Sequence, residues 1–100
     1  MTAQKAVDEI VAYINNNGGV YSAWYVGITS DYKQRLFTSH AVDERSGAWI
    51  CCPCDSATGA RNAERHFLER LMCKGGPGGG DDASSYIYAY KVTPGTFESV

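Results

Sequence analysis

The residues best suited to chemistry lie in the stretch Tyr25–Leu36, which carries a phenol, a glycine and a guanidinium at fixed spacing. The composition predicts a strand ending just after Gly27 and a helix capped by Ser30 or Asp31, with Arg35 on its first turns. An arginine at such a corner can bind a phosphate through two parallel hydrogen bonds. The positive helix N-terminus adds attraction for an anion, and the glycine allows a substrate to come close to the backbone.

Six elements, in the order α-β-α-β-α-β, are predicted around this corner. The first is a helix with Thr2 as its N-cap, ended by a run of asparagines and glycines. The last is a strand on which Tyr86, Tyr88 and Tyr90 alternate with other residues and so share one face. We expect a single domain of α/β (α+β) class, with a small three-stranded, mainly antiparallel sheet flanked by helices. The predicted elements are Ala3–Asn16, Val20–Thr29, Ser30 or Asp31 to His40, Ala48–Cys52, a helix from Asp55–Thr58 to Cys73, and Tyr86–Val92.

Length and composition limit the classes of protein to consider. The chain has 100 residues, 44% of them hydrophobic and 20% charged, which is typical of one globular domain. No apolar run approaches the roughly 18 residues that a membrane span needs. The segment Met1–Ile10 lacks the features of a secretory signal, so we expect a cytoplasmic location. The net charge of −2 counts against a free-standing, high-affinity DNA binder, because phosphate contacts supply most of that affinity.

The segment Ala23–Met72, half of the chain, resembles the GIY-YIG nuclease family. Members of that family have a strand ending in Tyr-Ile/Val-Gly and an arginine eight residues after the glycine, an interval that Gly27 and Arg35 match. The family also has a metal-binding glutamate on a later helix, the place that Glu64 takes here. The resemblance implies hydrolysis of DNA phosphodiester bonds with one Mg²⁺ or Mn²⁺ ion. One glutamate suffices, since Mg²⁺ is usually held by one or two carboxylates with water and substrate phosphate.

The first strand of the family motif is displaced in this chain. Gly19-Val20-Tyr21 has the expected letters, but Tyr21 and Tyr25 would lie about 13 Å apart along one strand and cannot form a hairpin pair. The segment Ser85–Val92 is similar to that first strand, with Tyr88 in the place of the motif tyrosine. We therefore hypothesise a circular permutation in which the last strand lies beside Val20–Thr29, a placement that the order of the sheet tests.

The histidine of the motif is also displaced. The family often has a histidine four residues after the arginine, where this chain has Ser39, and His40 follows one residue later. On an α-helix that step turns the side chain by about 100°. If the helix ends there, His40 would still reach the site as a catalytic residue, and the plainer interpretation is a residue of the helix end.

The resemblance implies a role for each motif residue. Glu64 would hold the metal ion, and Arg35 would bind the scissile phosphate and its transition state. Tyr25 or Tyr88 would orient or deprotonate the attacking water, with its pKa lowered by the nearby positive charges. Further phosphate contacts would come from Lys33, Arg61 and Lys91.

Plainer interpretations stand beside these. Arg35 or Glu64 alone would be a solvated charge, and His66 does not share a helix face with Glu64. The four cysteines are free thiols in a reducing cytoplasm, although a zinc site using Cys52, Cys54 and a histidine is conceivable. Gly75–Asp82 is interpreted as a flexible linker, because no Gly-Lys-Ser/Thr follows it.

A second function follows from the net charge and the displaced strand. The chain would then be a non-catalytic binding module that keeps the fold and acts on a protein partner, as an accessory protein of a phage or mobile element. Retention of the whole Tyr25, Gly27, Arg35 and Glu64 set favours the nuclease instead. The sequence does not predict the oligomeric state.

Overall fold

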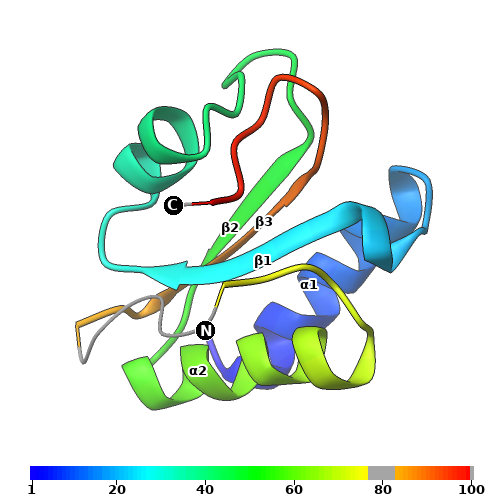
Figure 1. Ribbon diagram of the computed structural model, residues 1–100. Coiled ribbons are helices and arrows are strands. Elements are labelled where there is room, and N and C mark those ends of the chain that lie inside the picture. The colour runs from blue at the N-terminus through cyan, green and yellow to red at the C-terminus, as the bar shows by residue number, and fades with distance from the viewer. Residues whose placement is uncertain (77–82, 100) are drawn as a thin grey trace.

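The computed structural model describes residues 1–76 and 83–99, which form an α+β domain with one three-stranded sheet (Figure 1). Helical and extended segments alternate in the predicted order. Within the described residues, no helix is both long and apolar enough to cross a lipid bilayer. The elements are α1 (Ala3–Asn16), the 3₁₀ turn η1 (Tyr21–Ala23), β1 (Trp24–Thr29), the π-helix η2 (Gln34–Ser39), β2 (Trp49–Pro53), α2 (Ala57–Arg65), the π-helix η3 (His66–Arg70) and β3 (Tyr86–Lys91).

The strand order in the sheet is β1-β3-β2, and both pairings are antiparallel. The last strand of the chain is therefore the central strand. It pairs with β1 along its full length, from Trp24 opposite Lys91 to Thr29 opposite Tyr86. The prediction that the last strand lies beside the strand of Tyr25 is confirmed, as is the expected fold class.

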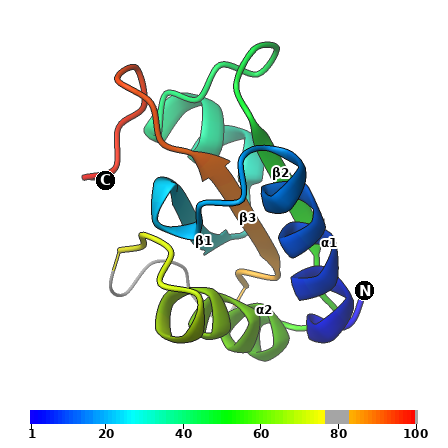
Figure 2. The ribbon, with the colours of Figure 1, turned by 90° about the vertical axis from the view of Figure 1, so that its right-hand side faces the viewer.

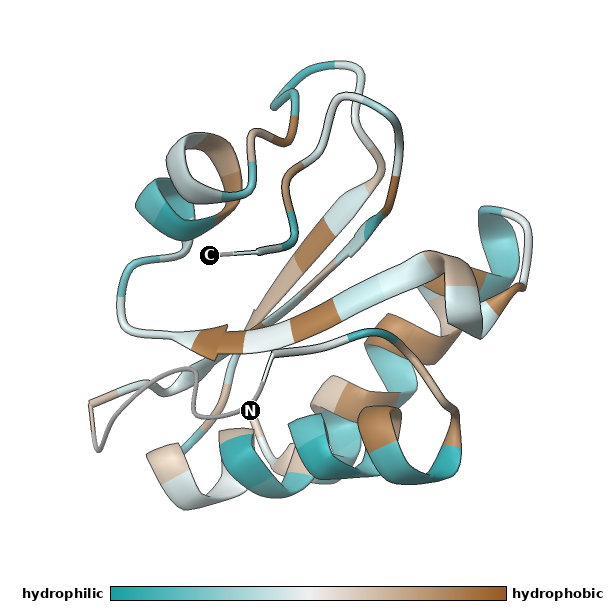
Figure 3. Cartoon of the chain, viewed as in Figure 1, coloured by the Kyte–Doolittle hydropathy of each residue, from teal (hydrophilic) through white to brown (hydrophobic). Residues whose placement is uncertain are grey.

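The two faces of the sheet are covered differently. Helices α1 and α2 cover one face, whereas η2 and the C-terminal segment lie on the other (Figures 1 and 2). Side chains alternate along β1, so Trp24, Val26 and Ile28 enter the core beneath the helices, while Tyr25 joins a second cluster beneath η2. Apolar and polar bands accordingly alternate along the strands in Figure 3. The row of tyrosines therefore faces away from α1 and α2.

Helix α1 follows its predicted limits. The Thr2 hydroxyl accepts a hydrogen bond of 3.1 Å from the Lys5 amide, as expected of an N-cap. At the other end, Gly18 and Gly19 have φ of 113° and 73°, and the Gly19 amide donates to the carbonyl of Ile14 at 2.9 Å. These positive φ values are those that only glycine adopts readily.

Other boundaries differ from the sequence predictions. The strand predicted from Val20 begins at Trp24, because Tyr21–Ala23 form a 3₁₀ turn. The third helix ends as the π-helix η3 at Arg70, before the predicted Cys73. The linker interpretation of Gly75–Asp82 falls mainly on residues 77–82, which lie outside the described residues.

Candidate functional site

Three tyrosines form the floor of the candidate site. Tyr25 of β1 stacks on Tyr90 of β3, with ring centroids 5.3 Å apart and an interplanar angle of 20°. It also lies nearly parallel to Tyr88, at 6.4 Å and 16°. All three rings are buried on the face covered by η2, since residues two apart on β3 share a face. The predicted shared face of the last strand's tyrosines is confirmed.

Gly27 is required by the phenol of Tyr88. The two residues lie directly opposite each other in the antiparallel pair. A β-carbon on Gly27 would lie 2.4 Å from the Tyr88 hydroxyl oxygen and 2.6 Å from Cζ, which is a severe overlap. The close backbone approach predicted at this glycine is thus made by Tyr88. Our expectation that a substrate comes close here is corrected, because the phenol occupies the space.

Arg35 projects from η2 toward the same two phenols. The helix begins as predicted, with the Asp31 carboxylate accepting a hydrogen bond of 3.2 Å from the Gln34 amide. The charge of Arg35 acts to lower the pKa of Tyr25, and it lowers the pKa of Tyr88 by hydrogen bonding as well as by charge. The side chain is half-buried. An arginine in this position combines contact with the floor of the site and access to solvent.

The π winding of η2 returns His40 to the site. The His40 amide donates to the carbonyl of Arg35 at 3.0 Å, a bond that spans five residues where an α-helix spans four. A π turn thus accommodates one extra residue. His40 therefore takes the place that Ser39 would have on an α-helix. The turn of about 100° per residue, which holds for an α-helix, does not separate His40 from the site. His40 lies at the end of the helix, as we expected, and its ring is fully buried.

His40 contacts all three tyrosine rings of the floor. Its Nε2 lies 2.8 Å from the Tyr88 hydroxyl. Its Nδ1 lies 2.7 Å from the carbonyl oxygen of Phe97 and 3.0 Å from the Tyr90 hydroxyl. The Tyr25 ring packs on the imidazole at a centroid distance of 4.6 Å. Burial lowers the pKa of His40, and the charge of Arg35 adds to that effect.

Glu64 lies on α2, the helix that covers the face of the sheet opposite to the tyrosines. Its side chain is buried, and Oε1 forms an ion pair of 3.3 Å with Arg61. Burial raises the pKa of the Glu64 carboxyl, although Arg61 acts in the opposite direction. The charge of Glu64 acts to raise the pKa of both Tyr25 and Tyr88. The guanidinium of Arg35 and this carboxylate, carried by two helices, therefore act on the same pair of phenols.

The pKa values of the tyrosines differ from our expectation. Arg35 lowers them as predicted, but burial has the larger effect and raises the pKa of Tyr88 to about 12. Burial also raises the pKa of Tyr25 above 10, although a hydrogen bond from the Gly76 backbone opposes the shift. The chain alone therefore keeps both phenols protonated at neutral pH. A deprotonation step at Tyr88 needs a proton acceptor beside it, and His40 Nε2 occupies that position.

The predicted phosphate contacts have separate outcomes. Arg61 lies beside Glu64, on the helix that carries it. Lys33 is exposed on the first turn before η2, next to the helix of Arg35. Lys91 does not belong to the site: it alternates with the tyrosines on β3 and lies on the opposite face, where its ammonium donates to the carbonyl of Asn17 at 3.4 Å. Our expectation for Lys91 was wrong for this geometric reason.

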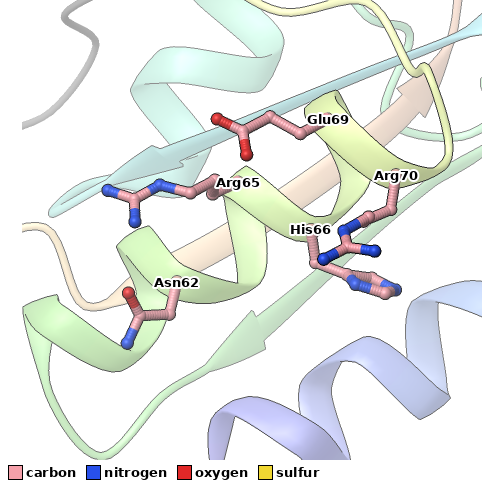
Figure 4. A pocket seen from close by; sticks show the side chains of 5 residues that line it. All are labelled: Asn62, Arg65, His66, Glu69 and Arg70. Atoms are coloured by element: carbon pink, nitrogen blue, oxygen red, sulfur yellow. The ribbon is translucent and has the colours of Figure 1, made fainter.

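A hollow separate from the tyrosine cluster lies on the outer surface of α2 and η3, with a volume of about 290 Å³. It is lined by side chains at helical spacing, two arginines among them (Figure 4). Among the described residues, Arg65 and Arg70 form no ion pair, so their charges are available to an anion. None of the predicted site residues lines this hollow. The lining residues are Asn62, Arg65, His66, Glu69 and Arg70.

The cysteines lack the features of a zinc site. All four thiols are free. Burial raises the pKa of Cys52 to about 11 and also raises the pKa of Cys54, so both thiols are protonated at neutral pH. The part of the chain that the structure describes contains no group of three or more histidine, cysteine or acidic side chains placed to hold a metal ion. Glu64 is a single carboxylate, which is enough for an ion whose other ligands are water and substrate phosphate.

Sequence reasoning missed the contribution of the C-terminal segment. The Tyr90 hydroxyl donates to Glu98 Oε2 at 2.7 Å, and the Phe97 amide donates to the His40 carbonyl at 2.7 Å. The period-two spacing of Tyr88 and Tyr90 was the one available signal, and it pointed only to a shared face.

No family of proteins, curated protein or solved structure matches this chain.

Proposed function

We propose that this chain is a metal-dependent endonuclease that hydrolyses DNA phosphodiester bonds, with a circularly permuted GIY-YIG arrangement. The observation that carries the proposal is the cluster of Tyr25, Tyr88 and His40, in which the rings are packed together and Tyr88 is hydrogen-bonded to His40 at 2.8 Å; the charges of Arg35 and Glu64 both act on its two phenols. Tyr25 and Tyr88 come from two neighbouring strands, and Arg35 and Glu64 from two helices. The central position of β3 supports the permutation, because it places Tyr88 opposite Gly27.

Arg35 binds the scissile phosphate in this proposal. Arg35 is half-buried, and its guanidinium can form two parallel hydrogen bonds with phosphate oxygens and stabilise the charge that develops in the transition state. Tyr88 moves the proton: its hydroxyl passes a proton to His40 Nε2, 2.8 Å away, as the oxygen takes a proton from the attacking water. Tyr25 stacks beside both groups and orients the water. Lys33 and Arg61 bind flanking phosphates.

The residues present fit a divalent metal ion at Glu64. Burial makes the ionised carboxylate costly, and the ion pair with Arg61 does not offset that cost, since the pKa stays raised. A Mg²⁺ or Mn²⁺ ion there would favour the ionised form, and would supply charge stabilisation for the leaving oxygen. Glu64 is then the protein's ligand, and Arg61 is free to turn toward phosphate. A reducing cytoplasm, where DNA is present and thiols stay free, suits this function.

A plasmid-nicking assay with purified chain tests the proposal. With Mg²⁺ or Mn²⁺ we expect supercoiled DNA to become nicked, and we expect Glu64→Ala and Arg35→Ala to lose that activity. Glu44→Ala is the matched control, because the side chain of Glu44 is exposed in the loop before β2. Absence of metal-dependent nicking in the wild-type chain, over both ions, would refute the proposal.

A non-catalytic binding module remains the second candidate function. The net charge of −2 favours it, because it weakens general affinity for DNA. In that case the polar cluster would serve the fold, and the partner would be a protein. The two functions separate in the same assay, since a binding module gives no nicking with either ion and equal behaviour of wild type and Glu64→Ala.

A further inference from the structure

The hydrogen bonds around His40 determine which of its ring nitrogens carries the proton. The Phe97 carbonyl can only accept a hydrogen bond, and it lies 2.7 Å from Nδ1. Nδ1 must therefore carry a hydrogen, since two lone pairs at that distance would repel each other. The burial of the ring favours its neutral form, so Nε2 has no hydrogen. The Tyr88 hydroxyl, 2.8 Å from Nε2, is then the donor in that bond.

Glu98 fixes the direction of the Tyr90 hydroxyl, so that it suits a hydrogen on Nδ1 of His40. The hydroxyl of Tyr90 donates to Glu98 Oε2 at 2.7 Å, so its lone pair faces Nδ1 of His40 at 3.0 Å. Without Glu98, the same hydroxyl could turn and donate to Nδ1 instead. That would stabilise the opposite tautomer, in which Nε2 carries the hydrogen and no longer accepts a proton from Tyr88.

The segment is held at this place by polar bonds and not by its apolar side chain. The Phe97 residue makes two backbone bonds with His40, because its amide donates to the His40 carbonyl at 2.7 Å and its own carbonyl faces Nδ1. Its phenyl ring, however, is 52% exposed. A segment kept only for hydrophobic cover would bury that ring. The groups that face His40 are Tyr25, Tyr88, Tyr90, Arg35 and Glu98, and the backbone of Phe97.

We propose that the C-terminal segment is a positioning element of the site: the Phe97 carbonyl, with Glu98 acting through Tyr90, holds His40 as the Nδ1–H tautomer. Nε2 is thereby kept open to receive the proton of Tyr88. The consequence for catalysis rests on the proposed nuclease function, whereas the tautomer itself does not. Phe97 and Glu98 do not touch the reacting atoms in this scheme, and their effect reaches Tyr88 only through the imidazole.

Long-range ¹H–¹⁵N correlation spectra of the ¹⁵N-labelled chain at neutral pH test the proposal directly, since the two tautomers of a neutral imidazole give different patterns. The chain has two histidines, and His66→Gln assigns the signals of His40. We expect the Nδ1–H pattern in the full chain. In a variant that ends at Thr96 we expect the Nε2–H pattern to become dominant, because the freed Tyr90 hydroxyl can donate to Nδ1.

Three substitutions in the full chain separate the contributions. Phe97→Ala keeps the backbone carbonyl and removes only the exposed ring, so the tautomer should not change. Glu98→Ala should give a mixture of tautomers, while Glu98→Gln keeps an acceptor oxygen for Tyr90 and should restore the wild-type pattern. Glu98→Ala also keeps the test valid if the shortened chain does not fold. The proposal is overturned by an Nε2–H pattern in the wild type, or by an unchanged pattern in both the shortened chain and Glu98→Ala.

The nicking assay supplies a second, independent arm. For Glu98→Ala we expect kcat to fall in proportion to the share of His40 that has left the Nδ1–H tautomer, with KM unchanged, and Glu98→Gln to recover most of the loss. In the variant that ends at Thr96 we expect a fall of roughly tenfold or more, because general acid–base steps contribute about 10²–10⁴-fold. If Glu98→Ala changes the tautomer but has the same kcat as the wild type, the segment does not position a catalytic group. Wild-type protein that gives the Nδ1–H pattern but never nicks DNA would reject the nuclease and leave the tautomer assignment standing.

Discussion

Replacement of Gly27 by alanine should destabilise the protein, because Tyr88 occupies the space that a β-carbon needs. The added carbon would lie 2.4 Å from the Tyr88 hydroxyl oxygen, 2.6 Å from Cζ and 3.0 Å from Cε1. The phenol cannot move away cheaply. It is 1% exposed, stacks near Tyr25 and is hydrogen-bonded to His40 at 2.8 Å. Either the ring or strand β1 must shift.

The expected size of the effect follows from two opposing terms. Overpacking a buried site costs about 1–3 kcal/mol in the free energy of unfolding. Removing a glycine from a strand returns about 0.5–1 kcal/mol, because alanine has less backbone freedom to lose on folding. We therefore expect Gly27→Ala to lower the free energy of unfolding by up to about 2.5 kcal/mol. For a domain of this size, each kcal/mol corresponds to a fall in Tm of about 4–8 °C.

Urea denaturation of a double-mutant cycle isolates the clash. Tyr88→Leu removes the hydroxyl, Cζ and Cε1 while keeping an apolar side chain, so Gly27→Ala in that background should be neutral or stabilising. The coupling energy should be about 1–3 kcal/mol. Gly95→Ala is the matched control, because its β-carbon would meet nothing closer than 3.8 Å. An equal loss from Gly27→Ala in both backgrounds would refute the reasoning.

Four further predictions concern other features. Ala41→Gly should raise the free energy of unfolding by up to about 1 kcal/mol in urea denaturation, because Ala41 has a φ of 57°. Glu64→Gln should raise the Tm at pH 7 but not at pH 3. Burial raises the pKa of Glu64 in the folded protein above its ordinary 4.5, so the folded protein loses stability as the pH rises through that value and the carboxyl ionises, whereas a glutamine stays neutral. Mn²⁺ should raise the Tm of the wild type but not of Glu64→Gln. Replacing Arg65 and Arg70 by alanine should weaken DNA binding evenly across sequences and reduce the slope of log K against log salt by about 2, measured by fluorescence anisotropy; an unchanged slope would exclude this surface from the interface.

The elements with strong local signals were predicted well from sequence. Helix α1 has the predicted limits because capping residues mark both ends and its apolar face repeats at helical spacing. The strand β1 was predicted too long at its start, since Val20–Ala23 have strand composition but form a turn. Composition reports which residues suit a pleated surface, and does not report where a strand stops pairing with its neighbour.

The sequence predicted those parts of the site that depend on the type of side chain, and not those that depend on the path of the backbone. Tyr25, Arg35 and Tyr88 were named from types and spacing, and they come together. The π winding that returns His40 to the site could not be predicted, because one extra residue in a helical turn leaves no compositional mark. The same limit applies to the Phe97 carbonyl, since every residue carries one and only the folded chain shows which of them reaches His40.

The position of β3 in the sheet links assembly of the site to completion of the fold. In the described structure β1 and β2 each pair with β3 and not with each other, so neither has a strand partner before the last element arrives. Both pairings join segments far apart in sequence, which makes them slow to form compared with a hairpin. Tyr88 is placed opposite Gly27 on one side and Cys51 on the other at that same step. The phenol, the glycine and the histidine therefore acquire their contacts together, and a substitution that weakens the β1–β3 pairing should remove the site and the sheet in one transition.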